Sequence, residues 1–222
     1  PANWITNGIF KARLAGLAPW GVACYRDAPM RYSAEHKQET KRRILAAAGR
    51  GFRKEGFGLI GVDGLARGAG VTSGAFYGHF RSKVEAFRAS LTGGLNELRQ
   101  AIEEIQTRVG EGWVESLADF YFTERVTCDL ADGCALPSLS GDVARGDAKT
   151  KAAFQKEYLG IVSALSKGLP GNSVEDREAR ALVMTALFTG GVTIARSLRD
   201  KAMRDRVARV LRNAVVACAT EK

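Results

Sequence analysis

The stretch Gly61–Phe80 (GVDGLARGAGVTSGAFYGHF) limits what this chain can fold into more than any other part of its 222 residues. Ala66 is small enough for two short helices to approach closely. Gly70, four residues later, can adopt the left-handed backbone that a sharp turn requires. Thr72 and Ser73 are residue types that cap the N-terminus of a following helix. The spacing therefore predicts two short helices that cross at a turn centred on Gly70.

The residues on either side of this stretch show the periodicity of amphipathic helices, and no segment alternates as a hairpin strand does. The expected helices near the N-terminal end cover residues 37–55, 62–69, 73–80 and, after the N-cap Ser82, about 84–105. A second helical block follows residue 112, is interrupted at 128–137 and 168–172, and ends in helices over 174–199 and 202–220. The predicted fold class is therefore all-α.

Two features of these helices bear on the tertiary structure. The inward residues of the two short helices are expected to pack on the preceding helix: Leu65, Ala69, Val71 and Phe76 against Ile44, Ala48 and Phe52. Inside the long helix, the adjacent Gly93 and Gly94 cost about 2 kcal/mol of helix propensity. They predict a kink or a true break between two domains, and a hinge at that point.

Positive charge is concentrated in one segment of the chain. Residues 31–90 carry twelve Lys or Arg and five Asp or Glu, a net +7, whereas residues 91–222 carry eighteen of each. A basic module joined to an electrically balanced one is typical of a protein that binds a polyanion such as nucleic acid. Charge alone also allows two other interpretations: that the basic segment binds an anionic membrane, or that its charges only keep the surface soluble.

Composition argues against several classes of site. The four cysteines lie far apart without a Cys-x-x-Cys pattern, and there are only two histidines, so neither a structural metal nor a cofactor is expected. No nucleophile with a base, no convincing pair of carboxylates and no phosphate loop is found, which argues against an enzyme. No run of eighteen apolar residues is present. We expect a reducing, cytoplasmic location.

Residues 1–30 are expected to be a leader outside the fold. The apolar stretch Leu14–Cys24 is similar to the core of a signal peptide, but two glycines and a proline interrupt it. We therefore expect Met30 to be the natural start. The rest of the chain is expected to divide into a helix-turn-helix domain over 31–90 and a helical domain over 91–222.

In a helix-turn-helix, the second helix enters the major groove of DNA, and its N-terminal, outward residues meet the base edges. Here these residues are Thr72, Ser73, Gly74, Ala75 and Gly78. None is an Arg, Asn or Gln that forms paired hydrogen bonds with a base. We therefore expect specificity to depend on DNA shape, thymine methyl groups, backbone amides and water, or on an arginine from elsewhere such as Arg67 or Arg42.

The sequence offers more suitable side chains for contacts with the DNA phosphates than for contacts with the bases. A hydroxyl, an imidazole and an ammonium group at the end of the motif are expected to anchor the backbone: Tyr77, His79 and Lys83. Three residues of the first helix are expected to grip the flanking backbone: Thr40, Lys41 and Arg43. For His79, packing beside Phe80 is the alternative interpretation.

The run Thr40–Ala89 resembles the DNA-binding domain of the TetR family of transcriptional regulators. That family has an A-x-x-x-G-V turn followed by Y-x-H-F-x-x-K, which here are Ala66, Gly70 and Val71, then Tyr77, His79, Phe80 and Lys83. The resemblance covers about fifty of the 222 residues. One departure is Gly78, because many family members carry a larger residue between the tyrosine and the histidine. The base contacts of this helix are therefore expected to differ from those of family members with a larger residue at this position.

The resemblance implies that the rest of the chain binds a small-molecule effector and dimerises, with the last two helices forming a four-helix bundle with a second copy. The apolar faces of those helices fit this arrangement: Leu182, Ala186, Phe188 and Val192 on one, Val207, Val210, Leu211, Val215 and Val216 on the other. The implied function is a homodimeric repressor that leaves its operator when the effector binds. The alternatives are a constitutive DNA-binding regulator without a ligand and, less favoured, a helical enzyme.

Six residues of the second domain are candidates for lining the effector pocket, although aromatic residues at helical spacing are also common in cores. They are Trp113, Phe120, Tyr121, Cys134, Phe154 and Tyr158. The segment Gly133–Asp147, expected as a break in the helices, is similar to one in a subset of the family. Cys134 at its start and Cys128 nearby are either redox or electrophile sensors or inert buried thiols.

Overall fold

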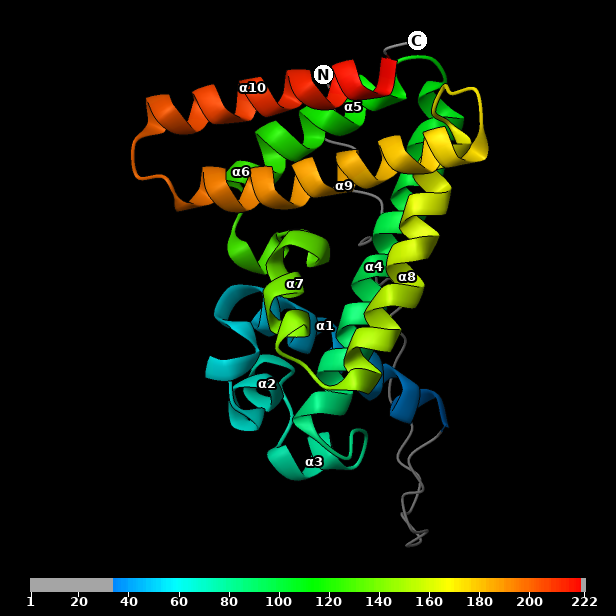
Figure 1. The fold of residues 1–222 in the computed structure, drawn as a ribbon. Helices are drawn as coiled ribbons and strands as arrows, with labels where there is room; N and C mark the ends of the chain where they lie inside the picture. Colours follow the sequence, from blue (N-terminus) through cyan, green and yellow to red (C-terminus); the bar gives the residue numbers. More distant parts are fainter. Residues whose placement is uncertain (1–33, 221–222) are drawn as a thin grey trace, which may run out of the picture. The chain divides into compact units, whose positions relative to one another are not determined.

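The structure, a computed structural model, describes residues 34–220, and every regular element among them is a helix (Figure 1). The expected leader over 1–30 lies outside the described residues. In chain order the helices are α1 Ala34–Leu59, α2 Val62–Gly68, α3 Ser73–Tyr77, α4 Lys83–Val109, α5 Trp113–Asp119, the π-helical η1 Phe120–Glu124, α6 Arg125–Thr127, the 3-10 turn η2 Leu130–Asp132, α7 Ala135–Ala144, α8 Ala148–Lys167, α9 Val174–Ser197 and α10 Lys201–Thr220. The all-α prediction is confirmed.

Helices α1, α2 and α3 pack around one apolar cluster together with the start of α4. The residues expected to face inward are in it, with Ile44, Ala48, Phe52 and Phe76 fully buried, except Val71, which is half-buried and packs against it. Helical geometry in α1 is interrupted at Gly56, which has φ 79°, as expected of a glycine stop. The bend turns the following residues, Phe57 included, back over Phe87 of α4.

Helix α4 begins as the sequence predicts. Its N-cap Ser82 accepts a hydrogen bond from the backbone N–H of Glu85 (3.1 Å), and the Glu85 carboxylate in turn accepts one from the N–H of Arg81 (2.7 Å). The Ser82 side chain thus satisfies an N–H group that the first turn leaves without a helical partner, and the Glu85 side chain binds the N–H of the residue just before the cap.

The expectation of a kink or break at Gly93 and Gly94 is wrong, because α4 runs through both residues without interruption. A Cβ placed on Gly94 would lie only 2.8 Å from the Cβ of Ala135 in α7. This close approach of two helices explains a glycine in mid-helix, and the packing against α7 offsets its poor helix propensity.

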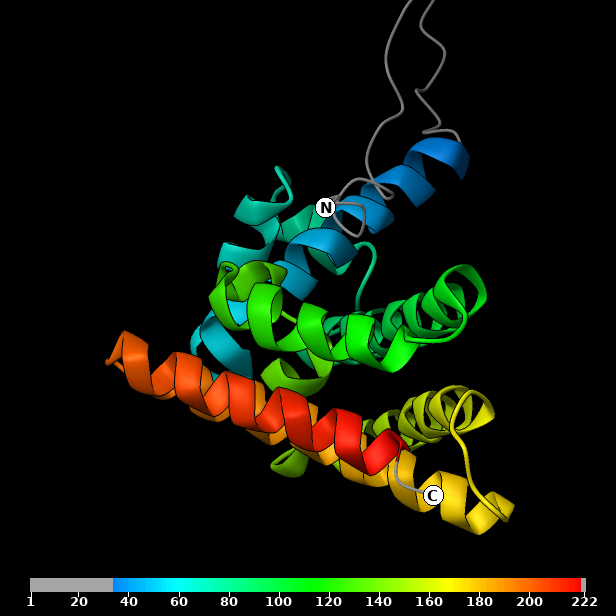
Figure 2. The same ribbon diagram turned by 90° about the horizontal axis from the view of Figure 1, so that it is seen from above.

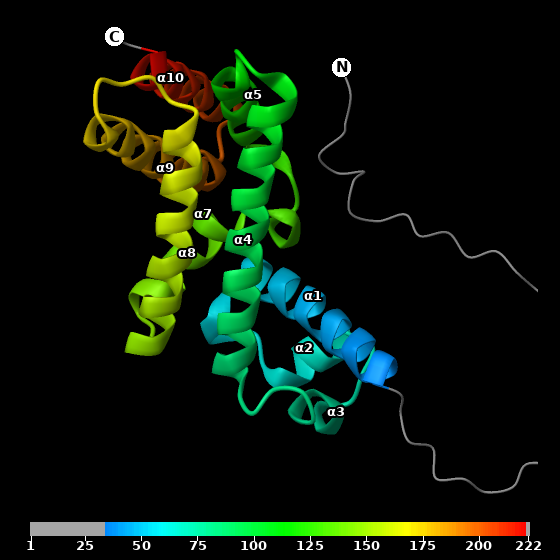
Figure 3. The same cartoon turned by 90° about the vertical axis from the view of Figure 1, so that its right-hand side faces the viewer.

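Helices α4 and α8 run side by side in the same direction over most of their length (Figures 1 and 3). An ion pair joins Arg88 to the α8 N-cap Asp147 (3.4 Å) at one end, and the amide of Gln106 donates to the carbonyl oxygen of Ala164 (2.9 Å) towards the other. The α4–α8 pair therefore extends from α3, at one end of the described part of the chain, to α5 at the other.

The expected break at Gly133–Asp147 is only partly right, because most of that segment forms helix α7. The segment is non-helical only at its two ends, up to the N-cap Cys134 and again over residues 145–147. Pro137 falls in the first turn of α7, where the missing N–H has no helical partner in any case. Pro137 is therefore compatible with a helix that starts here, and it does not prevent the segment from being helical.

Helices α9 and α10 are antiparallel neighbours (Figures 1 and 2). Their apolar residues divide between two faces. Phe188, Val192 and Val215 are buried, whereas one set points outward with exposed fractions of 44–57%: Leu182, Val183, Ile194, Met203 and Val210. Among the described helices, none is both long and apolar enough to cross a membrane.

Candidate nucleic-acid interface

The turn between α2 and α3 is closed by backbone hydrogen bonds. The N–H of Val71 donates to the carbonyl of Ala66, and that of Gly70 donates to the carbonyl of Arg67, both at 3.0 Å. With Gly70 at φ 65°, this is the Schellman arrangement, which needs a residue that tolerates positive φ. Ala66 is buried where the helices meet, as its small size predicts.

The start of α3 is capped by Thr72, whose hydroxyl accepts a hydrogen bond from the N–H of Ala75 (3.1 Å). The hydroxyl of Ser73 donates instead to the carboxylate of Asp63 in α2. Helix α3 ends at Tyr77, three residues earlier than expected. The contact between Asp63 and Ser73 could not be predicted from the sequence, because their side chains meet only once the turn has formed.

The outward face of α3 is made of small side chains. Thr72, Gly74, Ala75 and Gly78 are exposed and Ser73 is half-buried, while Phe76 on the opposite face is fully buried. Tyr77 is 55% exposed and its ring meets that of Phe76 edge-on, with 5.6 Å between centroids. Helix α3 lies at the end of the described part away from α9 and α10, with no other described helix beyond it (Figures 1 and 3).

Cationic and polar groups surround this face. The imidazole of His79 is half-buried, and burial together with Lys37 and Lys41 lowers its pKa below the ordinary value. His79 is therefore neutral at pH 7 in the free protein. Lys37 was not among the residues expected at this site, although it lies one helical turn before Lys41.

Two lysines near α3 rest on aromatic rings. The ammonium of Lys41 lies 5.8 Å from the centroid of Phe80, and that of Lys83 lies 4.5 Å from the centroid of Phe57. Such contacts with the ring faces hold the aliphatic stems in place and leave ammonium N–H groups available to water or an anion.

The other residues expected to contact DNA differ in their surroundings. Thr40 is half-buried, and Arg42 pairs with Glu39 at 2.6 Å while its side chain remains 77% exposed. Arg67 is exposed. The guanidinium of Arg43, in contrast, donates to the carbonyl oxygen of Ala69 at 2.7 Å.

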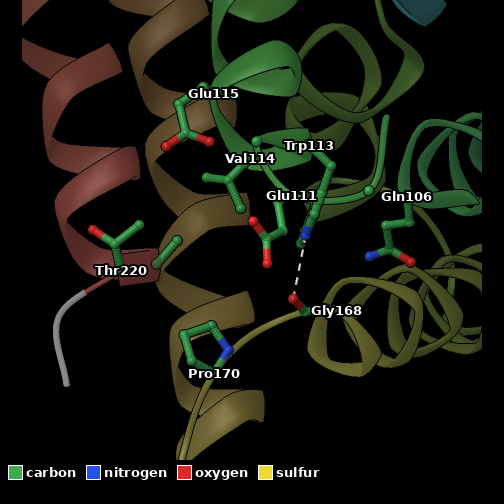
Figure 4. A pocket seen from close by; sticks show the side chains of 11 residues that line it. Gln106, Glu111, Trp113, Val114, Glu115, Gly168, Pro170 and Thr220 are labelled. Carbon is green, nitrogen blue, oxygen red and sulfur yellow. Dashed lines mark hydrogen bonds between the residues drawn. The ribbon is translucent and has the colours of Figure 1, made fainter. Parts of the chain in front are cut away.

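The six candidate effector residues have different surroundings. Trp113 lines an open cleft of about 460 Å³ near the α4–α5 turn, and its indole N–H donates to the carbonyl of Gly168 (3.2 Å; Figure 4). Phe154 and Tyr158 stack on one another in α8, and the Tyr158 hydroxyl lies 2.7 Å from that of Thr185 in α9. Phe120 is half-buried beneath the guanidinium of Arg125.

The hydroxyl oxygen of the buried Tyr121 lies 3.2 Å from Sγ of the half-buried Cys134. Burial raises the pKa of both groups, so both are neutral at pH 7. The Sγ of Cys128 instead lies 2.9 Å from the guanidinium of Arg196. Within residues 34–220, no group of three or more His, Cys, Asp and Glu side chains is placed to hold a metal ion.

Residues 44–89 match the family model of bacterial regulatory proteins of the tetR family. The chain is 42% identical over 62 residues to the HTH-type transcriptional regulator TtgR of Pseudomonas putida, and 43% over 61 residues to SrpR of the same species. Each match covers 28% of this chain and about 30% of the relative. The chain thus matches less than a third of each relative's length.

Solved structures with the same fold extend over most of the chain. The TetR-family regulator SCO4454 from Streptomyces coelicolor superposes with a TM-score of 0.67 at 18% identity, covering 82% of this chain and 95% of that one. NemR of E. coli in its reduced form superposes with a TM-score of 0.65 at 21% identity, covering 79% and 96%. At these identities the likeness shows a common fold.

Proposed function

Since the chain belongs, through its N-terminal helices, to the tetR family of bacterial regulatory proteins, we propose that it is a transcriptional regulator that binds operator DNA as a homodimer. A single observation supports this most: α3 presents an exposed face of small side chains while α1, α2 and the turn hold its other face in a packed core. A helix supported in this way is suited to enter the major groove.

Base edges are read by the exposed end of α3, and phosphates are bound by groups around it. Thr72, Ser73, Gly74, Ala75 and Gly78 approach the bases. Tyr77, His79 and Lys83 bind the phosphates on one side, and Thr40 and Lys41 of α1 bind them on the other. This division supports specificity from DNA shape and methyl contacts, because the reading side chains are too short for paired hydrogen bonds.

The remaining helices sense an effector and hold two copies together. The DNA-binding domain spans residues 31–90 and the regulatory domain 91–222. The exposed apolar side chains of α9 and α10 supply the dimer contact. The protein acts in the cytoplasm as a repressor, and a small molecule releases it from the operator by favouring another arrangement of the two domains. The regulators TtgR and SrpR, which it resembles, support a regulatory role and not an enzymatic one.

The test is a double variant, Tyr77→Phe with Lys83→Ala, measured on a DNA duplex that the wild-type protein selects from a random pool. Loss of the two contacts is expected to weaken binding, and loss of the Lys83 charge is expected to reduce the magnitude of the salt slope, d log K/d log [salt], by about 0.9. The control is Lys156→Ala, which removes an exposed lysine on α8. If the double variant, folded as judged by circular dichroism, binds as tightly as the parent, the proposed anchoring is wrong.

A further inference from the structure

The turn that positions α3 uses one carbonyl in an unexpected way. Within the turn, the carbonyls of Ala66 and Arg67 accept hydrogen bonds from the backbone N–H groups of Val71 and Gly70. The carbonyl of Ala69, the C-cap of α2, is instead reached by the guanidinium of Arg43 in α1. The distance from Nη2 to the oxygen is 2.7 Å, short for an N–H···O bond and in the range of charge-assisted ones.

The surroundings of Arg43 are shaped to admit this contact. The same Nη2 lies 3.5 Å from the carbonyl oxygen of Gly70. A Cβ added to Gly70 would lie 2.9 Å from this Nη2. One helical turn further along α1, a Cβ on Gly68 would rest 3.6 Å from the Cβ of Ala47. The α2 end therefore approaches α1 closely over both residues. The glycine of the turn is needed for its positive φ, and its missing Cβ leaves room for the guanidinium in the position observed.

The neighbouring arginine gives a direct comparison. Arg42 and Arg43 are adjacent on α1, yet Arg42 interacts with Glu39, one turn away on the same helix, and its side chain is 77% exposed. Arg43 crosses to the turn 26 residues further along the chain. Its side chain remains in contact with solvent, but the bond to Ala69 is partly buried. The donor that the sequence analysis assigned to a phosphate is directed at the protein's own backbone.

This turn sets the direction of α3, because the Thr72 cap begins three residues after Ala69. We propose that Arg43 is a positioning residue, which fixes the orientation of α3 by clamping the α2–α3 turn to α1, and is not a phosphate contact. The inference rests on the proposed function in so far as α3 reads DNA. It predicts that Arg43 determines selectivity between DNA sequences, whereas a phosphate contact would add affinity for every sequence.

The experiment compares Arg43→Met with Arg42→Met, which remove one positive charge each from adjacent positions. Dissociation constants are measured over a series of KCl concentrations for a duplex selected by the wild-type protein and for a scrambled duplex of the same composition. Arg43→Met is expected to bind the selected duplex on the order of tenfold more weakly than Arg42→Met. The two variants are expected to bind the scrambled duplex equally and to share one salt slope.

Two results would overturn the proposal. In the first, Arg43→Met loses the same factor on both duplexes and its salt slope is lower by about 0.9 than that of Arg42→Met, which identifies a phosphate contact. In the second, the two variants are indistinguishable on both duplexes. Should Arg43→Met not fold, Arg43→Lys keeps the charge but replaces the planar fork with a single flexible ammonium. It is expected to lose selectivity, and wild-type selectivity in that variant would contradict the clamp.

Hydrogen exchange in the absence of DNA separates failure of this inference from failure of the proposed function. The amides of Gly70 and Val71 are expected to exchange faster in Arg43→Met than in Arg42→Met, because the clamp is lost in the first variant only. Equal exchange would overturn the clamp whether or not the protein binds DNA. If the wild-type protein selects no duplex, the proposed function is overturned. The exchange rates would then still show whether Arg43 clamps the turn.

Discussion

Individual residues on and around α3 have unequal parts in the proposed interface. The side chains that would meet bases are short, and the groups that would meet phosphates are longer and lie on packed supports such as the rings of Phe57 and Phe80. His79 differs from the lysines because its charge changes near neutral pH. Burial, Lys37 and Lys41 keep it neutral in the free protein by lowering its pKa.

We expect His79 to make DNA binding pH-dependent. A phosphate beside the imidazole favours the protonated form, so the pKa is higher in the complex than in the free protein and a proton is taken up on binding. Affinity should therefore rise as pH falls from about 7.5 to about 6. Titration of a fluorescent duplex at several pH values checks this. His79→Gln should flatten the profile, and the control His36→Gln should keep it; a profile unchanged by His79→Gln would contradict the contact.

At the scale of elements, the end of α1 is bound to the segment from η2 to α7. The guanidinium of Arg53 donates to the carbonyl of Ala131 (2.8 Å), Arg50 forms an ion pair with Asp132, and the carboxylate of Asp142 accepts a hydrogen bond from the N–H of Phe57 (2.8 Å). The bond to Asp142 falls just after the interruption at Gly56. The segment from η2 to α7 thereby holds the end of α1 through backbone groups as well as side chains.

Asp142→Ala is expected to lower the free energy of unfolding by about 1–3 kcal/mol, because the partly buried N–H of Phe57 loses its acceptor. Urea unfolding at a fixed protein concentration measures the change. Asp142→Asn retains an acceptor oxygen and should cost less. Arg145→Ala removes only the exposed partner of the Asp142 ion pair and should cost about 0–1 kcal/mol. Equal losses in Asp142→Ala and Arg145→Ala would contradict the role of this bond.

Much of this architecture could be predicted from the sequence because it depends on local signals. The short helices, the turn at Gly70 and the caps Thr72 and Ser82 follow from residue types at fixed spacing. The uninterrupted helix at Gly94 could not be predicted, because the absence of a Cβ there matters only for the close contact with Ala135, 41 residues further along the chain. The partners of Arg43 and of the six effector candidates likewise depend on tertiary contacts, which periodicity does not encode.

At the scale of the whole molecule, the proposed dimer accounts for apolar side chains on α9 and α10 that no described helix covers. Phe188 and Val192 of the predicted α9 face are buried within one chain, whereas Ile194 is 54% exposed and Val210 of α10 is 57% exposed. Exposed apolar patches on paired helices are typical of an interface.

The double variant Ile194→Glu with Val210→Glu is expected to convert a dimer into a monomer, because it places charges in an apolar contact. Sedimentation velocity measures the mass of each species. The matched control is Leu159→Glu on α8, where a leucine has a comparable exposed fraction of 54%. A dimer that survives the double variant would place the interface elsewhere.

Selection of binding sites from random duplex DNA by the wild-type protein shows whether this chain recognises a DNA sequence. We expect an enriched, two-fold symmetric sequence whose half-sites lie about one helical turn, ~34 Å, apart. We also expect no sharp guanine preference of the kind that a paired arginine contact produces at the centre of each half-site. A folded protein that enriches no sequence over the starting pool would contradict the claim that this chain is a DNA-binding regulator.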